Sequence, residues 1–244
     1  MSELFNDGCR AGGPRRKHTG RKGCALLMLL AMCLAAACAW GICFVFGGPS
    51  SRLEEFPRRS QEPIVAPLYQ NPEFPSGCEA FSLAMCLRSM GYSGEPSALI
   101  DTYMPTDPTW SDFVNHFAGD ARSSGSAMPP AVVACVDAYA TAVDAPLHGV
   151  ELTGCSFDEI AAVVERGYPV LTWITTDFES PRFSTTGARG YRLYRNFHCV
   201  LLYRVQGGVA YVADPLIGLV EHDVHSFQTL WEDCGSLAMA VSES

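Results

Sequence analysis

The chain has 244 residues, which is enough for one domain of about 180 residues with appendages, and it carries a net charge of −9. The charge is unevenly distributed. Residues 1–46 contain six Lys and Arg against two acidic residues, whereas residues 47–244 contain eleven Arg, no Lys and 24 acidic residues, a net charge of −13. An acidic domain without a basic patch argues against nucleic acid as a partner.

The first recognisable segment is an uncharged apolar run over residues 24–46, CALLMLLAMCLAAACAWGICFVF. About 20 apolar residues suffice to cross a bilayer as a helix. The basic sequence RRKHTGRK precedes the run, and positively charged flanks stay in the cytoplasm. We therefore expect a cytoplasmic tail over 1–23, a transmembrane signal anchor in the lipid bilayer over 24–46, a linker over 47–63 and an extracellular domain over 64–244, attached to the cell membrane.

Two other interpretations of the apolar run remain open. A secretory signal cleaved after Ala35–Ala37 is one, although the apolar run continues past that site. A lipoprotein acylated at Cys38 is the other, but its aliphatic residue, Leu34, lies one position too early. We favour the uncleaved anchor.

Residues 71–91, NPEFPSGCEAFSLAMCLRSMG, predict a loop that runs directly into a helix. Proline and glycine interrupt the first part. From Glu79 onward apolar residues recur at steps of three and four, and Gly91 ends the helix. Cys78 therefore lies at a helix N-terminus, where free backbone N–H groups and the helix dipole favour thiolate over thiol. Taken alone, Cys78 is better explained as a small buried residue, as free cysteines usually are.

The remaining elements follow from hydrophobic periodicity and turn residues. We expect a strand at 64–69, helices at 97–103 and 131–142 on either side of a long polar loop at 104–130, a strand at 150–152, and a helix at 156–167 that opens with a capping box. Strands follow at 169–175, 197–205, 209–213 and 237–241, with a loop or hairpin at 177–194, a turn at 214–218 and a helix at 224–234. Helices followed by an antiparallel sheet indicate an α+β fold, preceded by one transmembrane helix.

Three further polar residues complete a candidate site. His198 begins one predicted strand and Asp214 ends the next, and a hairpin turn at Gln206–Gly208 would bring the two side chains to the same end of the sheet. Cysteine, histidine and a carboxylate are the minimum set for thiol acyl transfer. The side-chain amide of Gln70, eight residues before Cys78, could bind the oxyanion together with the Cys78 backbone N–H.

Five segments in this order resemble the C39-like cysteine peptidases, a papain-fold group of bacterial extracytoplasmic proteins related to the bacteriocin-processing peptidase domains. The segments are NPEFPSGCEAFSLAMCLRSMG, FAGDARSSGSAMPPAVV, RGYPVLTW, FHCVLLYR and AYVADPLIG. The resemblance covers roughly residues 64–242. It implies a papain-like fold in which N-terminal helices, including the helix of the nucleophile, precede an antiparallel sheet.

Carried over by position, the resemblance makes Cys78 the nucleophile, His198 the base, Asp214 its orienting group and Gln70 the oxyanion residue. The spacing between Gln70 and Cys78 is longer than in the transporter-linked members. The implied activity is that of a peptidase or amidase that acts on a peptide or amide substrate and needs no cofactor. The alternative is a catalytically silent papain-like domain that serves as a surface binding module.

The other candidate residues carry weaker signals. Cys199, His222 and His225 could form a metal site, since the two histidines have a usable spacing, but no second cysteine pair accompanies them. Trp110, Phe113, Tyr191 and Tyr194 are equally consistent with cleft walls and with packing. Cys86 and Cys199 lie in apolar runs and are expected in the core. An extracellular domain permits disulfides, but one sequence leaves their pairing open among Cys86, Cys135, Cys155, Cys199 and Cys234.

Overall fold

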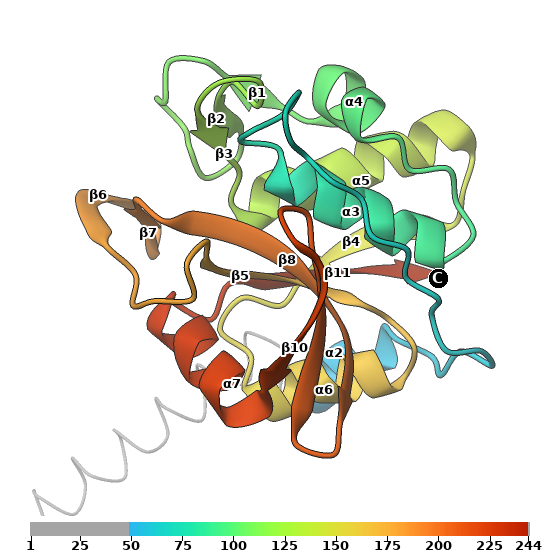
Figure 1. Ribbon diagram of the computed structural model, residues 1–244. Coiled ribbons are helices and arrows are strands. Elements are labelled where there is room, and N and C mark those ends of the chain that lie inside the picture. Colours follow the sequence, from blue (N-terminus) through green and yellow to red (C-terminus); the bar gives the residue numbers. More distant parts are fainter. Residues whose placement is uncertain (1–48, 244) are drawn as a thin grey trace, which may run out of the picture. The chain divides into compact units, whose positions relative to one another are not determined.

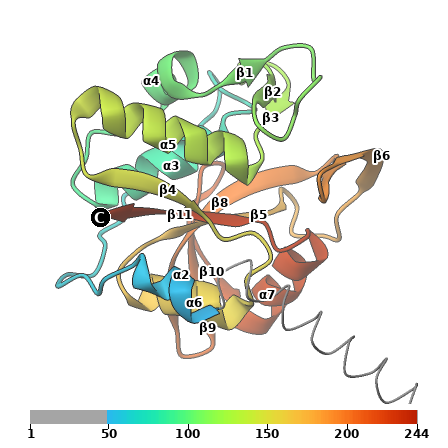
Figure 2. The ribbon, with the colours of Figure 1, turned by 180° about the vertical axis from the view of Figure 1, so that it is seen from behind.

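The computed structural model describes residues 49–243 (Figures 1 and 2). The helices are α2 Pro49–Glu54, α3 Cys78–Ser89, α4 Pro96–Ala98, the π-helical turn η1 Leu99–Tyr103, α5 Pro129–Val143, α6 Phe157–Glu165 and α7 Val224–Asp233. The strands are β1 Thr106–Asp107, β2 Phe117–Gly119, β3 Gly125–Ser126, β4 Leu147–Glu151, β5 Val170–Thr175, β6 Phe183–Ala188, β7 Tyr191–Tyr194, β8 Phe197–Gln206, β9 Val209–Asp214, β10 Gly218–Asp223 and β11 Ala238–Glu243.

The largest sheet has the strand order β10-β9-β8-β5-β11-β4, and each neighbouring pair is antiparallel. Strand β5, VLTWIT, lies near the middle and is buried along its whole length, as its continuous apolar sequence predicts. It pairs with β8 in a register that sets Trp173 opposite Cys199 and Ile174 opposite His198. The α+β class is confirmed.

Helices cover both faces of this sheet. In Figures 1 and 2, α3 and α5 lie on one face, whereas α2, α6 and α7 lie on the other. Helix α3 is buried from Cys78 to Leu87, which explains why its sequence is apolar almost all round rather than on one stripe. The core therefore fills the space on both sides of β5 and β8.

Two small sheets lie outside the central one. The predicted polar loop at 104–130 contains the short sheet β1-β2-β3, and residues 183–194 form the hairpin β6-β7. The loop around β1 is organised by the carboxylate of Asp107, which accepts hydrogen bonds from Thr109, Ser111 and the backbone N–H of Asp112. Strands β1, β2 and β3 are too short to give a periodic sequence pattern, whereas the β6-β7 hairpin is one of the two alternatives, loop or hairpin, that the sequence predicts for 177–194.

The predicted capping box of α6 is confirmed. Ser156 is the N-cap, its hydroxyl accepts from the Glu159 N–H, and the Glu159 carboxylate accepts from the Ser156 N–H at 2.7 Å. The helix ends at Glu165, and Gly167 follows with a φ of 91°.

We expect Ser156→Ala to lower the free energy of unfolding by about 1 kcal/mol, because the substitution leaves a first-turn N–H without its acceptor. Urea denaturation measures the loss. The matched control is Ser124→Ala in the turn between β2 and β3, an exposed serine whose loss should change stability by less than about 0.5 kcal/mol. Equal effects of the two substitutions would contradict the role of the cap.

Two sequence predictions are wrong in detail. Residues 64–69 form no strand, because Pro67 removes a backbone donor from the middle of the segment, and its apolar residues Ile64 and Tyr69 are exposed. The opposite error concerns β10, for which the sequence predicts no strand and only the turn that ends at residue 218. Its sequence GLVEHD lacks a clear apolar alternation, and it forms a strand by pairing along the edge of β9.

The N-terminal expectations fall partly outside the described residues. The predicted tail at 1–23 and the predicted span at 24–46 both lie there. Among residues 49–243, no helix combines the length and the apolar character needed to cross a membrane. The segment expected as a linker includes α2, and its Phe56 is fully buried against Tyr168.

Candidate active site

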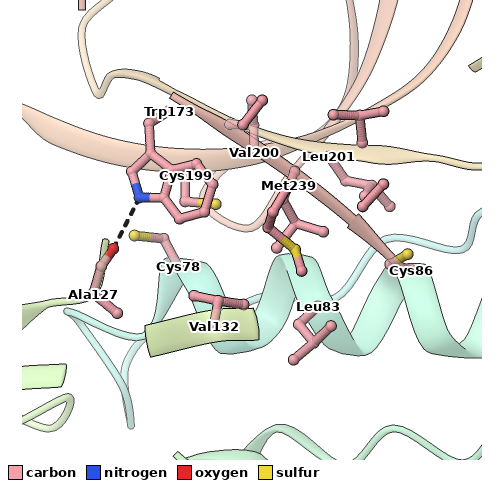
Figure 3. Packing of buried hydrophobic residues seen from close by; sticks show 14 of the residues in the cluster. Cys78, Leu83, Cys86, Ala127, Val132, Trp173, Cys199, Val200, Leu201 and Met239 are labelled. Carbon is pink, nitrogen blue, oxygen red and sulfur yellow. Dashed lines mark hydrogen bonds between the residues drawn. The ribbon is translucent and has the colours of Figure 1, made fainter. Parts of the chain in front are cut away.

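The N-terminus of α3 directs Cys78 toward the start of β8. The helix begins at Cys78, and its N-cap residue, Gly77, provides no side-chain acceptor. A side chain at Gly77 would clash, since an added Cβ would lie 2.9 Å from the Cβ of Phe74. Figure 3 shows Cys78 on the first turn of α3, facing the strands that carry Trp173 and Cys199. The predicted position of Cys78 at the helix start is therefore correct.

The protonation state of Cys78 differs from the sequence expectation. Burial raises the pKa of the thiol well above its usual value, and the neighbouring Glu79 carboxylate raises it further. The backbone N–H of Cys199 acts in the opposite direction. Only 6% of Cys78 is exposed, so the loss of hydration outweighs the favourable helix N-terminus. The resting residue is a thiol, with Sγ 3.3 Å from Oε2 of Glu79.

His198 and Asp214 form a buried pair. Nε2 of His198 lies 2.8 Å from Oδ1 of Asp214, and both residues are less than 10% exposed. Burial opposes ionisation of Asp214, but the hydrogen bond and charge of His198, together with the Leu216 N–H, bring the pKa of the carboxyl below its usual value. The antiparallel pairing of β8 and β9 thus brings these two residues together, as the predicted hairpin requires.

The thiol and the imidazole occupy the same region without a direct hydrogen bond. The Cys199 N–H that faces Sγ of Cys78 belongs to the residue after His198. Within residues 49–243, the side-chain partner of the thiol is Glu79 and that of the imidazole is Asp214. The sulfur and the imidazole are thus each bound to a different carboxyl group.

Gln70 connects the loop before α3 with the turn after Asp214. Its backbone N–H donates to the carbonyl of Pro215 at 3.0 Å, and its Nε2 donates to the carbonyl of Pro75 at 2.8 Å. The side chain is buried, and its Oε1 has no hydrogen-bond partner in the described structure. Gln70 thus lies between the segments that carry Cys78 and Asp214, with one of its two amide hydrogens engaged.

Glu79 is the residue of this region that sequence reasoning missed. It is fully buried, and its Oε1 accepts from the backbone N–H of Ala127 at 2.6 Å. The carbonyl of Ala127 in turn accepts from Nε1 of Trp173 at 3.0 Å (Figure 3). In the sequence, Glu79 resembles an ordinary acidic residue in the first turn of a helix, and no local signal indicates its burial.

The remaining candidates are the residues that the sequence offers for a metal site or for cleft walls. Among the described residues, no group of three or more His, Cys, Asp or Glu side chains is arranged to hold a metal ion. His222 lies in β10 and stacks on Phe178, with ring centroids 4.1 Å apart. Phe113 and Tyr194 are packing residues, whereas Trp110 is 40% exposed.

The cysteines of the described structure are all free thiols. Cys86 and Cys199 are fully buried, as predicted for core residues, and neither is part of a disulfide. The same free state is found for Cys78, Cys135, Cys155 and Cys234.

The chain is similar to two solved structures and matches one family model. A solved structure described as a C39-like peptidase from Bacillus anthracis has 24% identity and a TM-score of 0.62, and the match covers 75% of this chain and 99% of that one. A double glycine motif protease from an AMS/PCAT transporter, solved in complex with the leader peptide, has 15% identity and a TM-score of 0.43 over 77% of this chain and 98% of that one. No curated protein matches. Residues 54–239 match the model of the Peptidase_C39 like family, and the chain therefore belongs to that family.

Proposed function

We propose that the chain is a cysteine peptidase or amidase that uses Cys78, His198 and Asp214 for acyl transfer on a peptide or amide substrate. The observation that carries the proposal is the buried His198–Asp214 pair at 2.8 Å, beside a cysteine on the first turn of a helix. A buried imidazole held by a carboxylate has a fixed orientation and can accept a proton without losing its partner. Membership of the family supports the same chemistry.

Each residue of the proposed triad has a distinct task. Nε2 of His198 is engaged by Asp214, which leaves Nδ1 to take the proton of Cys78. The thiolate attacks the carbonyl carbon, and collapse of the tetrahedral intermediate breaks the C–N bond while the imidazolium gives its proton to the departing amine. Water then attacks the thioester, with His198 again as base, and releases the acid and the free thiol.

The oxyanion of each tetrahedral intermediate needs two donors. The backbone N–H of Cys78 is available at the N-terminus of α3, where first-turn amides have no intrahelical acceptor. The second donor in the proposal is the amide hydrogen of Gln70 that does not bind Pro75. The anchored extracellular location belongs to the same proposal, and it is supported by the uncharged run at 24–46 and the basic residues before it.

The test is covalent labelling of the full-length chain with an acyl probe, p-nitrophenyl acetate, followed by mass spectrometry of the peptide that contains Cys78. We expect acylation at Cys78 in the native protein and none at this position in Cys78→Ala. Cys86→Ala is the matched control, because Cys86 lies two turns further along the same helix and is fully buried. It should leave the labelling unchanged. Equal labelling of the native and Cys78→Ala proteins would refute the proposal.

A further inference from the structure

A second buried acid accompanies the proposed nucleophile. Glu79 is the residue after Cys78 on α3, and its exposed fraction is zero. One carboxylate oxygen accepts the Ala127 N–H at 2.6 Å, and the other lies 3.3 Å from Sγ of Cys78. The two contacts use both oxygens, so the carboxyl group is fixed between the sulfur and the loop that precedes α5.

No cation compensates this acid. Within residues 49–243, no ion pair includes Glu79, although the domain contains eleven arginines. Buried carboxyl groups are ordinarily paired with a cation or bound to metal. Burial raises the pKa of Glu79 to about 7, against the opposing effect of the Ala127 N–H. An unpaired buried carboxyl that titrates near neutrality beside a nucleophile is typical of a functional group.

The geometry determines how Glu79 acts on the sulfur. A carboxylate can only accept a hydrogen bond, so at 3.3 Å it accepts the S–H of Cys78 and stabilises the thiol. The same negative charge repels a thiolate. Both effects favour the protonated sulfur, and its hydrogen bond is directed to Glu79, whereas the hydrogen bond of His198 is to Asp214.

We propose that Glu79 is a positioning residue that holds the Cys78 thiol in a resting arrangement, from which the sulfur must turn before it reacts with His198. The resting state is released when the carboxyl group is protonated or when the sulfur is drawn toward the imidazole. The second part of this inference rests on the proposed function. The first part, control of the thiol by Glu79, stands on the contacts alone.

Other titratable groups around the sulfur do not substitute for Glu79. They are Cys199 on β8, Tyr194 on β7 and the His198–Asp214 pair. Burial raises the pKa values of Cys199 and Tyr194 well above their usual values, so both stay neutral near pH 7. Asp214 stays ionised there, because its pKa is below the usual value. Glu79 is thus the carboxyl group whose charge changes in the neutral range.

The experiment measures the rate at which iodoacetamide alkylates Cys78 in the full-length chain, resolved by mass spectrometry, between pH 5.5 and 9.5. Glu79→Gln keeps the shape of the side chain. Its amide oxygen can still accept from the Ala127 N–H, and its NH₂ group offers the sulfur a hydrogen-bond donor instead of a negative charge. Each unit of decrease in the thiol pKa gives about tenfold more thiolate, partly offset by lower nucleophilicity, so we expect a rate increase of about threefold per unit at pH 7.5. Asp158→Asn is the matched control, because this acid is exposed in the first turn of another helix, α6, and its loss should leave the rate within about twofold.

The outcomes separate the two proposals. A slower or unchanged rate in Glu79→Gln overturns the inference, whatever the protein hydrolyses, because alkylation needs only the thiolate. If Glu79→Gln does not fold, the pH profile of the alkylation rate in the native protein tests the inference instead. Ionisation of Glu79 near pH 7 should produce a shoulder in the logarithm of the rate against pH, and a profile with uniform slope through this range overturns the inference. If p-nitrophenyl acetate does not label Cys78 in the native protein while the alkylation rates are as expected, only the proposed function is contradicted.

Discussion

Replacing His198 by alanine should reduce the rate of acylation of Cys78 by about 10²–10⁴-fold, the range that a positioned general base contributes. The thiol has a raised pKa and is almost entirely protonated at neutral pH, so a neighbouring base must take its proton during the attack. Stopped-flow release of p-nitrophenolate measures the rate. His225→Ala is the matched control, because His225 is exposed on the first turn of α7 and is not part of the site.

Variants of Asp214 distinguish orientation from charge within the same experiment. Asparagine keeps an oxygen that can accept from Nε2 of His198 and from the Leu216 N–H, so Asp214→Asn should lose less activity than Asp214→Ala. A His198→Ala rate within threefold of the native value would contradict the assignment of His198 as base. Equal losses in the two Asp214 variants would show that its charge, and not its geometry, supports the imidazole.

The parts of the site that could be predicted are those fixed by local chemistry. Cys78 was placed at a helix start by the prolines and glycine before it and the apolar spacing after it, and the structure begins α3 at that residue. His198 and Asp214 were brought together by a single turn at Gly207 and Gly208, whose φ values of 61° and 82° suit a tight hairpin. In each case the relevant contact lies within one short segment of chain.

The parts that could not be predicted depend on long-range packing. The raised pKa of Cys78 results from burial under β8, and that burial is invisible in a sequence that places the thiol beside a helix dipole. Glu79 is buried because the loop at Ala127, 48 residues away, closes over it. Likewise β10 exists because β9 offers an unpaired edge, not because its own sequence alternates.

Trp173→Ala should lower the free energy of unfolding by about 3–5 kcal/mol, the usual cost of truncating a fully buried aromatic residue to alanine. Trp173 has no exposed surface and lies in β5, between the two strands that pair with it. Its indole N–H also donates to the carbonyl of Ala127, and the backbone N–H of Ala127 donates to Glu79. The substitution therefore opens a cavity and removes a contact that positions the site.

Guanidinium denaturation followed by circular dichroism measures the loss, and two variants divide it into its causes. Trp173→Phe retains most of the buried ring but leaves the Ala127 carbonyl without its donor, so it should lose about 1–3 kcal/mol. Trp110→Ala is the matched control at an indole that is 40% exposed, and we expect less than about 1 kcal/mol there. A Trp173→Ala loss no larger than that of Trp110→Ala would mean that the contact between β5 and the loop at Ala127 does not hold the site together.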